Sequence, residues 1–87
     1  MSKPTSGTVV AVNHGLGIFV IETGKGDCIV LEAAGRLAIK VGDTVNGDWL
    51  APDFIKVSNV TQNCDTHAKV QKSTVSRGEA ISSMAVI

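Results

Sequence analysis

An excess of charge of either sign is missing from this sequence. Eight lysine and arginine residues balance eight aspartate and glutamate residues, so the formal net charge at pH 7 is zero. A neutral chain exerts no overall attraction on nucleic acid or on anionic membranes. Contact with a polyanion would therefore depend on a local cluster of basic side chains.

Long apolar runs and paired cysteines are also lacking. No run approaches the roughly 18 residues that cross a bilayer, and the opening MSKPTSGTVV does not resemble a signal peptide. Cys28 and Cys64 lie far apart and form no C-x-x-C motif. We therefore expect a cytoplasmic protein with two thiols and no membrane partner.

No catalytic or cofactor-binding constellation is present. Cys64 and His67 have a C-x-x-H spacing, but a structural zinc ion needs four donors. His14 stands in an Asn-His-Gly cluster, which is typical of an exposed turn. We therefore expect no metal, no cofactor and no enzymatic activity.

The chain has short β-type runs separated by turn residues. Hydrophobic residues form 44% of the sequence, which favours a folded domain. Five runs are expected as strands, at residues 7–12, 16–23, 28–33, 44–50 and 54–61. Their order predicts an all-β protein, a small five-stranded OB-like barrel over residues 6–62. An SH3-like barrel fits the strand count nearly as well.

Composition changes after residue 62, and residues 63–87 are expected to form a C-terminal tail, either flexible or docked. Ser76 and Glu79 have the spacing of a helix capping box. An apolar stripe with helical spacing follows, which predicts one short helix over residues 77–87. The stripe consists of Ala80, Ile81, Met84, Ala85 and Ile87.

Several short segments resemble known families. Gly15-Leu16-Gly17-Ile18-Phe19 and Asp27-Cys28-Ile29-Val30-Leu31 are similar to the cold-shock domain, an OB-fold. Val41-Gly42-Asp43-Thr44-Val45 resembles the OB domain of a family of ribosome-assembly GTPases. Both resemblances imply an OB barrel that meets RNA or single-stranded nucleic acid.

The base-stacking aromatics of the cold-shock family are replaced by aliphatic residues. If the alignment holds, the corresponding positions form an outer binding face made of Ala11, Leu16, Ile18, Ile29 and Leu31. Phe19 and Ile21 then point into the core. A face assignment wrong by one residue would place the aliphatic set in the core instead.

The resemblance implies a non-enzymatic binding module with weak affinity for single-stranded nucleic acid or RNA. Phosphate contacts are expected from Lys25, Arg36, Lys40 and Lys56. The alternative is a protein-interaction or self-association module that uses the aliphatic face. That face could be covered by the tail, by a second copy of the chain or by another protein.

Overall fold

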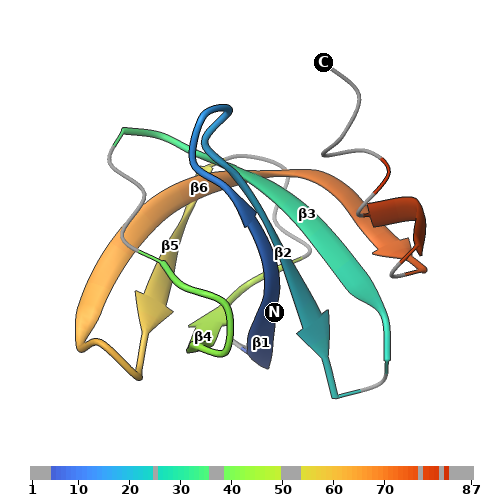
Figure 1. The fold of residues 1–87 in the computed structure, drawn as a ribbon. Coiled ribbons are helices and arrows are strands. Elements are labelled where there is room, and N and C mark those ends of the chain that lie inside the picture. The colour runs from blue at the N-terminus through green and yellow to red at the C-terminus, as the bar shows by residue number, and fades with distance from the viewer. Residues whose placement is uncertain are drawn as a thin grey trace.

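The chain folds into a closed antiparallel β-barrel (Figure 1). A computed structural model describes residues 5–24, 26–35, 39–49, 54–76, 78–80 and 82. Over these residues it has six strands: β1 (Thr5–Asn13), β2 (Ile18–Thr23), β3 (Cys28–Ala33), β4 (Thr44–Gly47), β5 (Phe54–Asn59) and β6 (Cys64–Val75). The prediction of a small all-β barrel is confirmed, with one more strand than expected.

Two meanders build the barrel. Strands β1–β3 form one and β4–β6 the other, and the pairs β1–β4 and β3–β6 join them. The spatial order β4-β1-β2-β3 is that of a Greek key. Closure pairs the strands on both sides, which protects the sheet from edge-to-edge association.

The sixth strand lies in the segment expected to be a tail. It pairs with β5 on one side and with β3 on the other, so the expected domain boundary at residue 62 falls inside the barrel. Its inward positions alternate with exposed polar ones, as required of a strand with one buried face. The inward residues are Thr66, Ala68 and Val70, and the exposed ones are Asp65, His67, Lys69 and Gln71.

Aliphatic side chains and two aromatic rings fill the barrel interior. Phe19 and Ile21 are fully buried there, as predicted from the alternation of β2. Trp49 is also buried there. The complete inner cluster is Val9, Phe19, Ile21, Ile29, Leu31, Ile39, Val45, Trp49, Ile55, Val57 and Ala68.

Gly47 makes room for the Trp49 ring. A Cβ atom at position 47 would lie 2.8 Å from Cη2 and Cζ3 of the indole, closer than carbon atoms approach without displacement. The absence of a side chain on this inward position of β4 therefore lets the tryptophan pack across the strand.

A β-bulge in β1 places two adjacent side chains on the outside of the barrel. The β1–β2 register shifts between Val9 and Ala11, so Val10 is the extra residue. Val9 packs in the inner cluster and Val12 packs against it, whereas Val10 and Ala11 pack against a second cluster outside the barrel. The bulge thus widens the apolar surface on the outside of β1 and β2.

Candidate nucleic-acid interface

The predicted aliphatic face is only partly on the outside of the barrel. Ala11 and Ile18 lie there, half-buried, and Leu16 is half-buried in the β1–β2 turn. Ile29 and Leu31 lie in the barrel interior, so their assignment to an outer binding face is wrong.

Strand register explains this correction. Phe19 pairs with Leu31 and Ile21 pairs with Ile29. Directly opposed residues of antiparallel strands lie on the same face of the sheet. Since Phe19 and Ile21 point inward, their partners on β3 must point inward as well, and Val30 takes the outer position instead.

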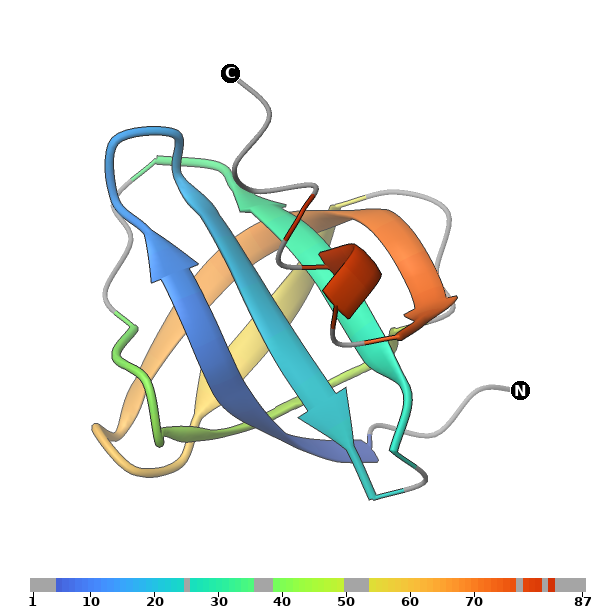
Figure 2. The ribbon, with the colours of Figure 1, turned by 45° about the vertical axis from the view of Figure 1, so that its right-hand side comes forward.

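The outer apolar cluster is covered by the chain itself. A helical turn at residues 78–80 and 82 places the side chain of Ala80 against β2 and β3, with none of it exposed. Figure 2 shows this turn, in red, in front of β3. The other members of the outer apolar cluster are Val10, Ala11, Ile18, Val20, Cys28 and Val30.

The predicted capping box holds the start of this turn. The backbone N–H of Glu79 donates to Ser76 Oγ at 3.2 Å, and Ser76 Oγ donates to Glu79 Oε1 at 3.3 Å. The N–H of Ala80 donates to the Ser76 carbonyl at 2.9 Å. Of the predicted apolar stripe, Ala80 packs against the outer apolar cluster. The other four members of the stripe lie outside the described residues.

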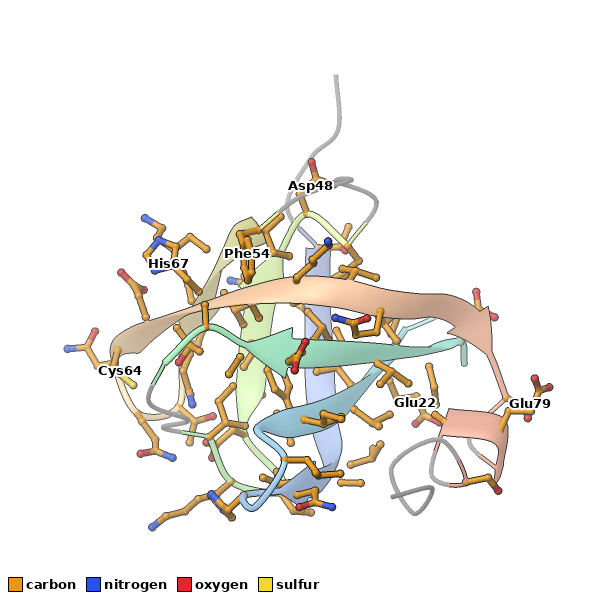
Figure 3. The ribbon with its side chains drawn as sticks, turned by 90° about the horizontal axis from the view of Figure 1, so that it is seen from above. Glu22, Asp48, Phe54, Cys64, His67 and Glu79 are labelled. Carbon is orange, nitrogen blue, oxygen red and sulfur yellow. The ribbon has the colours of Figure 1, made fainter. Side chains whose placement is uncertain are left out.

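A second outer surface, on β5 and β6, has a different character. Phe54 pairs with Lys69, and Lys56 pairs with His67, so these four side chains share the outer side of two neighbouring strands. All four are exposed, and Phe54 keeps 55% of its surface open to solvent. Figure 3 shows Phe54 and His67 on the same side of the barrel. We call these four residues the basic–aromatic face.

The basic side chains of this face are accessible to an external ligand. Among the residues that the structure describes, none forms a hydrogen bond or ion pair with the side-chain nitrogens of Lys56, His67 or Lys69. Acidic residues border the face on two sides. Glu32 on β3 lies opposite Lys69 and accepts a hydrogen bond from Gln71. Asp65 precedes His67 by two residues on β6.

Of the two predicted phosphate contacts that the structure describes, Lys56 belongs to this face and Lys40 does not. Lys56 is exposed at its centre. Lys40 is exposed in the turn before β4, where its charge and its backbone N–H both act on Asp43. Lys25 and Arg36 lie outside the described residues.

The buried carboxylate of Asp43 holds the C-terminal end of β5 through hydrogen bonds. Asp43 Oδ2 accepts hydrogen bonds from Asn59 Nδ2 at 2.8 Å, from Gln62 Nε2 at 2.6 Å and from the Lys40 N–H at 2.9 Å. The amide of Asn59 contributes most to lowering the pKa of Asp43, and the other two donors and the Lys40 charge add to it, against the opposing effect of burial. This network ties the turn before β4 to the turn between β5 and β6.

The C-x-x-H spacing does not form a metal site. In β6, residues three apart point to opposite faces, so Cys64 is half-buried while His67 is exposed on the outside. No group of three histidine, cysteine or acidic side chains comes together within the described ranges.

Sequence reasoning missed Phe54, His67 and Lys69. The alternation of polar and apolar residues from Asp65 to Gln71 predicts a strand with one solvent face, which would have placed His67 and Lys69 together. Nothing in the local sequence pairs that strand with Phe54, because this contact depends on the register of β5 with β6.

Comparisons with known proteins found no matching family model, no similar curated protein and no similar solved structure. The helical turn near residue 80 is far too short to cross a membrane, and no longer apolar helix occurs elsewhere in the described part of the chain.

Proposed function

We propose that this protein is a non-enzymatic barrel module of OB type that binds single-stranded nucleic acid or RNA weakly through the basic–aromatic face. The observation that supports this function is the exposed ring of Phe54 beside Lys56, His67 and Lys69. An aromatic ring stacks on any base, and neighbouring cations hold the phosphates.

The barrel type is part of the same proposal. OB-folds are Greek-key barrels with five strands, and β1–β4 of this chain have Greek-key order. The sixth strand then makes this chain a variant that uses β6 to close the barrel. OB-folds use the face of β2 and β3 for their ligand, but Ala80 covers that region here, so we place the ligand on β5 and β6.

Weak binding follows from the small number of contacts. The face offers one stacking ring and two lysines, with Glu32 and Asp65 nearby. One stacked base contributes about 1–3 kcal/mol, and each lysine replaces about one counterion on the strand. We therefore expect dissociation constants in the high micromolar range at low salt and no retention on a nucleic-acid column near 0.15 M salt.

Fluorescence anisotropy with labelled oligothymidine and oligouridine tests this function. Lys56→Gln should weaken binding several-fold, whereas Lys40→Gln, another exposed lysine placed off the face, should not. Equal losses from both variants would indicate diffuse attraction, and the absence of binding at low salt would refute the proposal.

The alternative, a protein-interaction or self-association module, keeps one supporting observation. Val10, Ala11 and Ile18 remain half-exposed at the border of the outer apolar cluster. If this border is an interface, Ile18→Asp should lower the mass measured by light scattering or abolish capture of a partner. An unchanged mass, together with oligonucleotide binding, would favour the nucleic-acid function.

A further inference from the structure

His67 stands between two lysines on the basic–aromatic face. It is exposed on β6, opposite Lys56 on β5, and Lys69 follows two residues later on the same side of the strand. Cross-strand partners have Cβ atoms about 5 Å apart. A phosphate group close to Lys56 therefore lies within reach of the imidazole as well.

The charged groups around His67 come from three strands, and β3 contributes Glu32, which lies opposite Lys69 on the same outer side. β5 contributes Lys56, and β6 contributes Asp65 on one side and Lys69 on the other. On its other side, β6 meets Ala33 and Ala34, which bear no charge, and the Ala34 N–H donates to the His67 carbonyl at 2.8 Å. The imidazole thus has two lysines and two carboxylates around it and is held by none of them.

We propose that His67 is a conditional phosphate-binding residue of this site. The inference rests on the proposed function and adds the pH control of binding to it. Histidine side chains change charge between about pH 5 and 8. A neutral ring leaves two cations for the phosphates of the strand, and a protonated ring supplies a third, so binding of a single strand is accompanied by proton uptake at His67.

The salt dependence of binding measures the number of phosphates contacted. For single strands, the slope of log K against log salt is about −0.7 per contact. Oligothymidine binding should therefore have a slope of about −1.4 near pH 8 and about −2.1 near pH 5.5. Affinity at fixed low salt should rise over the same pH interval.

The two histidines of the chain provide a matched pair of variants. His67→Gln should keep a slope of about −1.4 at both pH values, whereas His14→Gln, which changes an exposed ring in the β1–β2 turn, should behave like the unmodified protein. Calorimetry near pH 6.5 in buffers of different ionisation enthalpy should show proton uptake in the His14→Gln protein and much less in the His67→Gln protein.

Several results would overturn the inference in distinguishable ways. A slope that does not change with pH, or an equal change in both variants, refutes the role of His67 but leaves the binding function standing. Inorganic phosphate that competes at pH 5.5 as strongly as the oligonucleotide would show an anion site without base recognition. Absence of oligonucleotide binding at both pH values would refute the function and the inference together.

Discussion

The outside of this barrel has two surfaces of opposite character. Over β1–β3 an apolar cluster lies on the outer side, and Ala80 of the chain's own helical turn packs against it. Over β5 and β6 the outer side chains are Phe54, Lys56, His67 and Lys69, and they are open to solvent. The centre of the apolar outer surface is therefore buried within the chain itself. The exposed surface carries one aromatic ring, two lysines and a histidine, and it is the one to which we assign the proposed ligand.

Truncation of one inward and one outward side chain on β2 and β3 should give the largest change in stability and should distinguish the barrel interior from its outer surface. Leu31→Ala removes a fully buried side chain from the inner cluster and should lower the free energy of unfolding by about 2–5 kcal/mol. Ile18→Ala, on the outside and half-buried, should cost about 1 kcal/mol. Urea unfolding measures both changes, and a reversed order would contradict the register of β3.

The contribution of the aromatic ring should be the next largest effect. Phe54→Ala should lose about 1–3 kcal/mol of oligonucleotide binding, because the stacked base loses its platform. The free energy of unfolding should change by no more than about 0.5 kcal/mol, since the ring is largely exposed. Val60→Ala, an exposed apolar residue on a turn, is the control and should leave affinity unchanged.

Much of the barrel could be predicted from the sequence because the first five strands have local signals. β-branched runs and turn residues gave β1–β5 within a few residues, and the capping box gave the start of the helical turn. β6 was missed because its polar residues resemble those of a flexible tail. The face of Ile29 and Leu31 was wrong because it was inferred from a family alignment rather than from pairing with β2.

The candidate site was harder to predict from the sequence than the strands, because it is formed by residues on two different strands. Lys56 was predicted as a phosphate contact. The residue opposite it, His67, lies on the next strand, and the register of β5 with β6 brings the two together. Local sequence does not determine such pairing, since a shift of one residue would send every side chain to the opposite face.

A charge placed under the helical turn should expose the outer apolar cluster. Ala80→Asp should lower the free energy of unfolding by about 1–3 kcal/mol, because an unpaired carboxylate cannot stay buried against Val20 and Val30. It should also increase the binding of a hydrophobic dye. Ser82→Asp, exposed on the same turn, is the control. Equal behaviour of the two variants would mean that the turn does not protect the cluster.

Acid should weaken the barrel through Asp43, with a smaller effect. The pKa of Asp43 is lowered by its hydrogen bonds in the folded protein. The stabilisation is therefore complete above its unfolded value of about 3.8 and is lost as the pH falls through the lower folded value. Urea unfolding between about pH 2 and 6 should show this loss, and Asp43→Asn should reduce it.

An exposed carboxylate provides the comparison for Asp43. Asp65→Asn should keep the acid sensitivity of the unmodified protein, because Asp65 is exposed on β6. If Asp43→Asn and Asp65→Asn had the same pH profile, the network around Asn59 and Gln62 would not be the source of the acid sensitivity.

Amide chemical shifts recorded during an oligothymidine titration at low salt would locate the bound strand on the barrel. We expect shifts at Phe54–Ser58 and Asp65–Gln71 on β5 and β6, and none at Val20 or Val30 beneath the helical turn. Shifts confined to β2 and β3, or no shifts at high micromolar oligonucleotide, would contradict binding through the basic–aromatic face.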